Sequence, residues 1–204
     1  MLIVVLLFVQ NNRKPASVQP NGIAASEDGS QDIKLPPSTL PVNEDGLIEA
    51  VFPKNLLGGG TAEDFYKDYL ANSEYQKLVT DVKVNDDGTV SIFFTPNQLE
   101  TYRKNIYNTA QYQKYYEVES IKEVIYENDQ LTEITVLVDS DLYQQNGFER
   151  QMCNLLLSSD VGTYQILSGV PPDEWHTTIT IKDVDTGDIV SKTDFPNEDM
   201  FRAK

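Results

Sequence analysis

The sequence predicts an α+β domain, in which hairpins form an antiparallel sheet and helices pack on one face of that sheet. Alternating apolar runs broken by short turns occur three times, at residues 82–94, 121–138 and 178–190. A stretch with apolar residues at helical spacing precedes each hairpin, and a single strand precedes the first helix. Strands joined by hairpins must pair antiparallel, and amphipathic helices must cover a sheet face, so this order favours α+β.

The first strand is expected at residues 47–52, where Pro53 stops it. Three glycines at 58–60 then lead to Thr61, whose hydroxyl is suited to cap a helix. The residues expected to face the core from this helix are Ala62, Phe65, Tyr69 and Leu70. The hairpin at 82–94 follows, and Gly88 supplies the positive φ that its turn needs.

Thr95 and Pro96 resemble a cap followed by proline at the first helical position, so a helix is expected from there to about Tyr116. The second hairpin turns at residues 127–130. Asp139 and Ser140 then cap a third helical region, which is expected to break near Asn146 and Gly147. Gly162 or Gly169 ends that region, and the last hairpin turns at 185–187. The chain is therefore a strand followed by three helix-hairpin units, starting near Thr61, Thr95 and Ser140.

Four segments are predicted along the chain. Residues 1–9 are an apolar run that resembles a truncated signal or anchor, since it spans only about 12 Å of a hydrocarbon core about 30 Å thick. A buried strand is the alternative for this run. Residues 10–45 hold five prolines among polar residues and predict a disordered spacer, so proteolysis should trim to a core near Leu47. Residues 46–197 form one α+β domain, and 198–204 form a tail.

The net charge of −16 argues against a nucleic-acid partner or an anionic membrane surface, because both need a basic footprint. An apolar leader followed by a spacer indicates an extracytoplasmic protein, secreted or anchored at the cell surface. The membrane is therefore expected as a partner only through an N-terminal anchor, if one is retained. The expected partner is an unidentified extracellular protein, peptide or glycan.

The motifs that could carry chemistry have simpler structural interpretations. Cys153 is the only cysteine, which excludes an internal disulfide and a cysteine zinc site, and its apolar neighbours favour a core position. His176 is the only histidine and has no nucleophile motif beside it. The acidic turn at 183–188 has glycine at its fifth position and lacks the glutamate of a calcium loop, and the turn at 85–88 places its carboxylates too close in sequence to wrap an ion. The glycines at 58–60 lack the Gly-Lys-Ser/Thr ending of a phosphate loop.

The helix after Thr95 also carries a run of tyrosines, for which core and rim packing is favoured over an exposed aromatic stripe. These are Tyr102, Tyr107, Tyr112, Tyr115 and Tyr116. The sequence thus predicts no catalytic, cofactor-binding or metal-binding residue and no cofactor.

Several stretches together resemble uncharacterised extracytoplasmic proteins of Gram-positive gut bacteria, many of which are lipoproteins. They read VFPKNLLGG, TAEDF, VKVNDDGTVSIFFTPNQLETY and IKDVDTGDIVSKTDF, and the resemblance spans about residues 47–195. It implies location outside the cytoplasm, with no catalytic residues to carry over. The chain departs from the lipoprotein pattern because no cysteine follows the apolar run.

The leading hypothesis is a surface-displayed or secreted module, without enzymatic activity, that binds a protein, peptide or glycan. The alternative is a secreted hydrolase or metal-dependent enzyme whose acidic site is assembled from distant carboxylates. A third possibility is a structural or inhibitory module that pairs with a partner strand through an exposed sheet edge.

Overall fold

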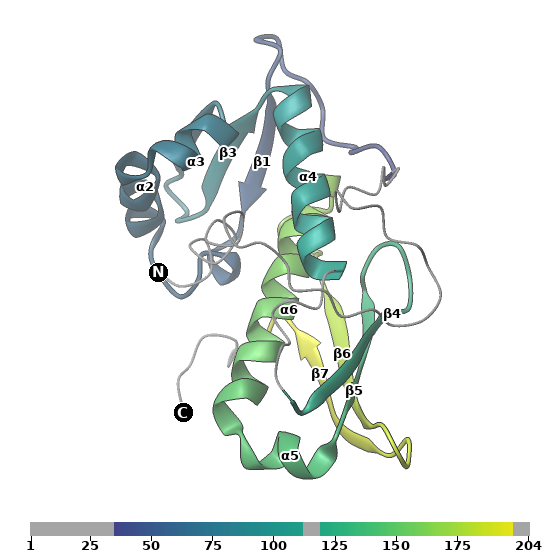
Figure 1. Cartoon of the computed structure of the whole chain (residues 1–204). Helices are drawn as coiled ribbons and strands as arrows, with labels where there is room; N and C mark the ends of the chain where they lie inside the picture. The colour runs from purple at the N-terminus through teal and green to yellow at the C-terminus, as the bar shows by residue number, and fades with distance from the viewer. Residues whose placement is uncertain (1–34, 112–118, 198–204) are drawn as a thin grey trace.

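The computed structural model describes residues 35–111 and 119–197, in which helices and strands alternate (Figure 1). In chain order the elements are β1 (Ile48–Phe52), the 3-10 turn η2 (Lys54–Leu56), α2 (Ala62–Ala71), α3 (Ser73–Leu78), β2 (Asp81–Val84), β3 (Val90–Phe94), α4 (Pro96–Gln111), β4 (Ile121–Tyr126), β5 (Glu133–Val138), α5 (Ser140–Gln145), α6 (Gly147–Ser168), β6 (Thr177–Asp183) and β7 (Ile189–Phe195). The α+β class and the order of three helix-hairpin units are confirmed.

The hairpins are divided between two sheets. The first sheet has the order β1-β3-β2 and is antiparallel throughout. The second has the order β4-β5-β6-β7, and its central pair, β5 and β6, runs parallel. That pairing differs from the single antiparallel sheet that the sequence predicts. It arises because α5 and α6 form a crossover connection between β5 and β6, and such a connection brings the second strand back in the same direction.

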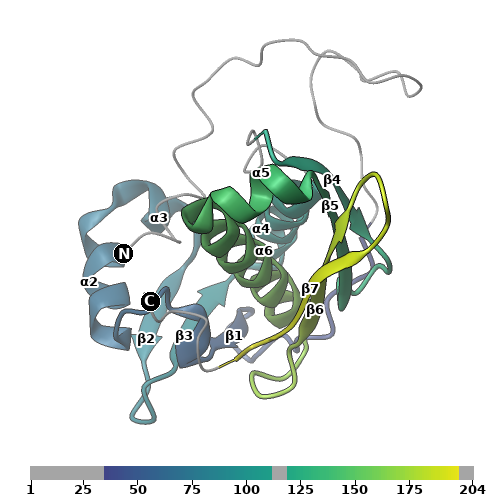
Figure 2. The ribbon, with the colours of Figure 1, turned by 90° about the horizontal axis from the view of Figure 1, so that it is seen from below.

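Helices α4 and α6 lie between the two sheets (Figure 2). The three-stranded sheet buries the face that carries Ala50 and Ile92, whereas Glu49 on its other face is exposed. The four-stranded sheet buries the face that carries Val136 and Ile181. Each sheet thus has helices on one face, and residues from both sheets and from α4 and α6 share one hydrophobic core.

The predicted helix starts at Thr61, Thr95 and Asp139 are confirmed by their caps. The Thr61 hydroxyl accepts a hydrogen bond from the Asp64 amide at 3.1 Å, and the Thr95 hydroxyl accepts one from the Gln98 amide at 3.2 Å. The Asp139 carboxylate accepts one from the Leu142 amide at 3.1 Å. These side chains satisfy amide groups that have no partner within the helix, which fixes where each helix begins.

Three details of the predicted helices are corrected. Leu70 does not face the core, since 54% of its surface is exposed. The helical region continues after Asn72 as α3, which periodicity did not predict. Gly169, with φ of 103°, ends α6, whereas Gly162 lies buried inside that helix.

The domain begins earlier than predicted, because residues 35–45 are folded onto it rather than forming part of a disordered spacer. The Ser38 hydroxyl donates to the Leu167 carbonyl at 2.9 Å, and the Thr39 amide donates to the Ser168 carbonyl at 3.1 Å. These carbonyls end α6 and have no partner within the helix, so a segment without apolar periodicity gains order by supplying donors to them. The predicted segments at 1–9 and 198–204, and residues 10–34 of the spacer, lie outside the described residues.

Substituting Gly169 with alanine is expected to destabilise the protein by about 2–4 kcal/mol and to release the segment at 35–45. A Cβ at Gly169 would overlap the Thr39 hydroxyl, and the φ of 103° is strained for any other residue. Urea unfolding and the rate of proteolysis within residues 35–45 measure the two effects.

Gly187→Ala is the matched control, because Gly187 also has a positive φ of 75° but a Cβ there meets nothing within 4 Å. It is expected to cost only about 1 kcal/mol and to leave the proteolysis rate unchanged. Equal losses for the two variants would contradict the tight contact between Gly169 and Thr39.

Candidate functional site

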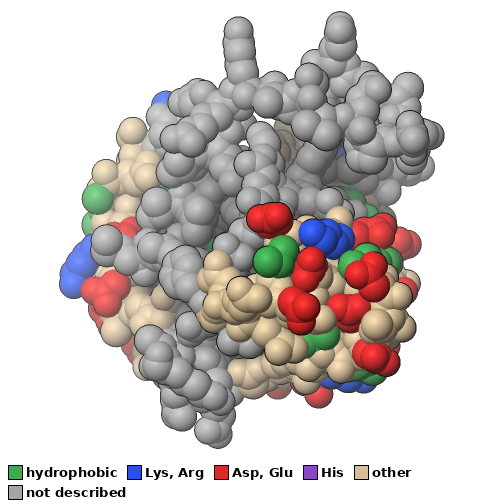
Figure 3. Space-filling view, turned by 60° about the horizontal axis from the view of Figure 1, so that its bottom comes forward, with side chains coloured by type: hydrophobic (Ala, Val, Ile, Leu, Met, Phe, Trp, Pro, Cys, Tyr) green, Lys and Arg blue, Asp and Glu red, His purple; other side chains and the backbone are tan. Residues whose placement is uncertain are grey.

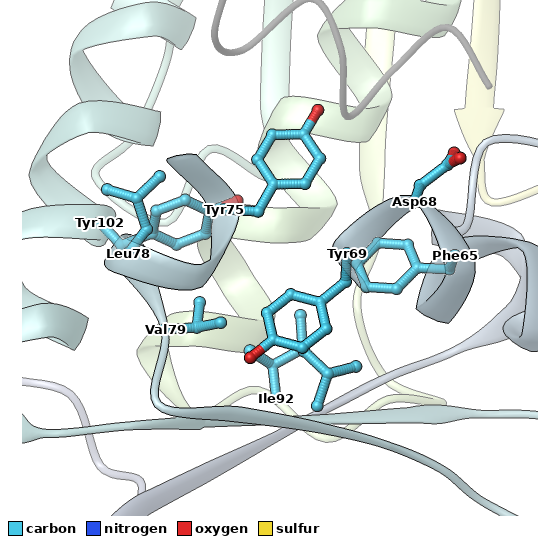
Figure 4. Close-up of a pocket in the computed structure, with 9 residues that line it drawn as sticks. Phe65, Asp68, Tyr69, Tyr75, Leu78, Val79, Ile92 and Tyr102 are labelled. Atoms are coloured by element: carbon cyan, nitrogen blue, oxygen red, sulfur yellow. The ribbon is translucent and has the colours of Figure 1, made fainter. Parts of the chain in front are cut away.

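An aromatic pocket with a cavity of about 40 Å³ lies where α2 and α3 pack against the three-stranded sheet (Figure 4). Four aromatic and four aliphatic side chains form its walls, together with one carboxylate. The lining residues are Phe65, Asp68, Tyr69, Tyr75, Leu78, Val79, Val82, Ile92 and Tyr102. We call this site the aromatic pocket.

Local structure explains how these side chains meet. Phe65, Asp68 and Tyr69 follow one another at helical spacing, so they share one face of α2. The chain turns at Asn72, after which α3 and the residue that follows it carry three more lining side chains to the pocket. Val82 is the cross-strand partner of Ile92, so the two lie side by side on the buried face of the sheet.

Neighbouring rings hold two of the tyrosines in place. The Tyr69 ring lies 6.2 Å from the Tyr66 ring, centroid to centroid, with an interplanar angle of 31°. The Tyr102 ring lies 5.7 Å from the fully buried Phe94 ring. Such contacts restrict the side-chain torsions, so the pocket is largely formed before anything enters it.

The pocket carries neutral hydroxyls and negative charge. Burial, with a smaller contribution from the Asp68 charge, raises the pKa of the Tyr75 hydroxyl. Burial and the Asp81 charge raise the pKa of Tyr69, and burial raises that of Tyr102, with smaller contributions from Tyr75 and Asp160. All three phenols therefore stay protonated at neutral pH. None of the described residues that line the pocket is a lysine, arginine or histidine.

This arrangement is suited to binding. The aromatic rings offer apolar surface for contact, the hydroxyls can donate or accept hydrogen bonds, and Asp68 adds one negative charge. A hydrolytic site needs an activated nucleophile or a pair of carboxyl groups close together. Among the described residues that line the pocket, the ionisable groups are the Asp68 carboxylate and the three phenols.

A second hollow, of about 380 Å³, lies along β4 and the turn that follows it, beside Tyr107 of α4. It is polar, and its acidic residues are Glu123, Glu127 and Asp129. The Glu127 carboxylate already accepts a hydrogen bond from the Thr135 hydroxyl at 2.7 Å. The aromatic pocket, in contrast, has rings around it and an apolar floor, and these features favour ligand binding. We therefore treat the aromatic pocket as the candidate site.

The motifs weighed in the sequence lie outside the aromatic pocket. The His176 side chain is exposed, with Nδ1 3.0 Å from the Glu174 carbonyl oxygen. The Asp183 carboxylate accepts hydrogen bonds from the amides of Ser140, Asp185 and Thr186, at 3.2, 3.0 and 2.8 Å. Hydrogen bonds from Ser140 and Thr186 hold the pKa of Asp183 well below its usual range. This carboxylate therefore organises the hairpin turn and the start of α5.

Of the tyrosines considered in the sequence and Cys153, some are described by the structure and others are not. Tyr102 lines the aromatic pocket, and Tyr107 packs on Tyr164 with ring centroids 5.3 Å apart, so both serve core or rim packing. Tyr112, Tyr115 and Tyr116 lie outside the described residues. Cys153 falls within α6, at a position whose side chain is not among those described.

Asp160 is the one acidic group in the described residues that is held protonated by burial. It lies on α6 with 5% of its surface exposed, and burial raises its pKa to about 8. No hydrogen bond or ion pair links its carboxyl to another described residue. It is not among the described residues that line the aromatic pocket, although once ionised its charge acts on Tyr102 there.

Within residues 35–111 and 119–197, no group of three or more His, Cys, Asp or Glu side chains is arranged to hold a metal ion. None of the helices in these ranges is both long and apolar enough to cross a bilayer. Comparisons with protein-family models, curated proteins and solved structures returned no match to this chain.

Proposed function

We propose that the protein is a binding module without enzymatic activity, secreted or displayed at the cell surface, that holds a protein, peptide or glycan in the aromatic pocket. The pocket is the observation that supports binding, since its rings and apolar floor present a recess into which one chemical group can fit. The apolar leader and the polar segment after it, together with the resemblance to extracytoplasmic proteins, support the location.

The composition of the pocket favours these classes of ligand. Aromatic faces bind the apolar face of a sugar ring or an extended side chain, and hydroxyls at the ring edge add hydrogen bonds. Phe65 and Tyr69 are half-buried, so each ring keeps some surface for a ligand. Asp68 would add selectivity for a ligand group that donates hydrogen bonds or carries positive charge.

The test is retention of the full chain on peptide and glycan arrays, compared with Tyr69→Ala. Wild-type protein is expected to bind a set of related array members, and the variant to bind them at least about tenfold more weakly, because aromatic anchors dominate such sites. Circular dichroism and urea unfolding check that the variant folds.

Leu70→Ala is the matched control, because Leu70 follows Tyr69 on α2 but is exposed and lies outside the pocket. This variant is expected to bind as the wild type does. The proposal is wrong if neither ligand class retains the protein, or if retained ligands bind equally well to Tyr69→Ala.

A further inference from the structure

We propose that the group held by the aromatic pocket is a quaternary ammonium of choline type, a trimethylammonium on a short chain with no anion beside it. This inference rests on the proposed binding function and names the chemistry of its ligand. Four aromatic rings, one carboxylate at the pocket and the volume of the cavity each point to this group.

The rings supply the attraction. Phe65, Tyr69 and Tyr75 lie around the pocket in Figure 4, and Tyr102, partly hidden behind α3 in this view, also lines it. An aromatic face carries partial negative charge, so a cation that lies over the face of one of these rings is attracted to it. The contacts of Tyr69 with Tyr66 and of Tyr102 with Phe94 keep the rings in place, so little order has to be gained on binding.

The charges near the pocket favour a cation. The Asp68 carboxylate and the Tyr75 hydroxyl lie on the same side of the pocket in Figure 4, and the Asp68 charge acts on that hydroxyl. Asp81 acts in the same way on Tyr69. Among the residues that the structure describes, no basic side chain lines the pocket, and the whole chain carries a charge of −16. The acidic side chains that gather on the right of Figure 3 lie on the side of the four-stranded sheet, so they add only to this overall charge. A ligand with a phosphate or carboxylate next to its ammonium would meet repulsion here.

The size and polarity of the cavity favour a methylated ammonium over a primary one. A water needs roughly 10–15 Å³ by the same measure, so the cavity of about 40 Å³ takes a group with the bulk of about three waters. A trimethylammonium group has a similar bulk. A primary ammonium is strongly hydrated and must exchange several water contacts for protein acceptors. Asp68 and the phenol hydroxyls offer such acceptors at one side, but the floor of Val79, Val82 and Ile92 is apolar and suits the methyl groups of a quaternary ammonium better.

The experiment is a titration of the full chain with choline, followed by NMR chemical shifts and by calorimetry. The neutral isostere 3,3-dimethylbutanol, which replaces nitrogen with carbon, is the control for shape, and phosphocholine is the control for an adjacent anion. Choline is expected to bind at least about tenfold more tightly than the isostere and several-fold more tightly than phosphocholine. Shifts should concentrate on α2, α3 and β3.

Two variants locate the binding. Tyr69→Ala is expected to weaken choline binding at least about tenfold, and Asp68→Asn about threefold to tenfold, with the Asp68 effect shrinking at high salt. Leu70→Ala, the control outside the pocket, should bind choline as the wild type does.

The outcomes separate this inference from the proposed function. Equal affinity for choline and its isostere, or for choline and phosphocholine, would overturn the inference and leave the pocket as a site for neutral groups. The same holds if choline causes no shifts while an array ligand binds in a manner that depends on Tyr69. If neither choline nor any array member binds, both proposals are wrong.

Discussion

Replacing Asp160 with asparagine is expected to stabilise the protein at neutral pH by about 4 kcal/mol, with no gain near pH 4. Asp160 is 5% exposed on α6, and burial raises its pKa from 3.8 to about 8. Asparagine has nearly the same shape and never ionises, so the variant avoids the cost of keeping this buried acid protonated. The protein is therefore stabilised wherever the unfolded chain would release the proton.

The direction of this stability change follows from proton binding by Asp160 in the folded and unfolded states. Between pH 4 and 8 the unfolded chain has lost the Asp160 proton, whereas the folded chain still holds it. The free energy of unfolding contributed by this group is highest below pH 4 and falls by about 1.4 kcal/mol per pH unit up to about pH 8. Above pH 8 both states are ionised, and the difference between wild type and variant becomes constant.

Urea unfolding of both proteins from pH 4 to pH 9 measures this difference. Taking the difference removes the effects of the other carboxylates, including those whose hydrogen bonds lower their pKa, such as Asp183. Asp188→Asn makes the same substitution in an exposed turn and is expected to change the free energy of unfolding by less than about 0.5 kcal/mol. A difference for Asp160→Asn that stays flat with pH would contradict the burial of an isolated carboxyl.

Local chemistry made much of this fold predictable. The turn at Gly88 and the caps at Thr61, Thr95 and Asp139 depend on residues a few positions apart, and all four occur where the sequence indicates. The division into two sheets could not be predicted in this way. This division depends on the path that α6 takes between β5 and β6, and the periodicity within a single helix or strand carries no information about that path.

The burial of polar residues on α6 also could not be predicted from the pattern of polar and apolar residues. A helix between two sheets is buried on nearly all sides, so Ser158, Ser159 and Asp160 are enclosed even though their polarity suggests a solvent face. The prediction of disorder at residues 35–45 was wrong because it considered composition alone. Polar residues there predict disorder, but the hydroxyls of Ser38 and Thr39 donate to the carbonyls of Leu167 and Ser168 at the end of α6.

The aromatic pocket was predictable in part. The helical spacing of Phe65 and Tyr69 correctly predicted that both face inward from α2, but it gave no sign that they border a cavity. Tyr75 was missed because α3 is only six residues long, too short for a clear period. The available signal was Asn72, which interrupts one helix, followed by Tyr75, Leu78 and Val79 at helical spacing.

Truncating Trp175 to alanine is expected to cost about 3–5 kcal/mol, because this side chain joins the two halves of the core. Trp175 lies just before β6 with 2% of its surface exposed, and its indole nitrogen donates to the Asn55 side-chain oxygen at 3.2 Å. Its ring also faces Gly162 on α6, where an added Cβ would lie 2.9 Å from a ring carbon and 2.7 Å from a Leu56 methyl. The indole therefore fills the space between η2 and α6, and no room is left for a side chain at Gly162.

A double-mutant cycle with Gly162→Ala tests that packing. Alone, Gly162→Ala is expected to destabilise the protein, because overpacking costs about 1–3 kcal/mol while helix propensity returns at most about 1 kcal/mol. In the Trp175→Ala background the ring no longer crowds the added methyl, and the Leu56 methyl can move into the vacated space, so the same change should stabilise by about 0.5–1 kcal/mol. Urea unfolding of the four proteins gives the coupling energy, expected at about 1–3 kcal/mol. Additive effects would mean that Leu56 alone limits the space at Gly162, and that the indole can move aside without loss.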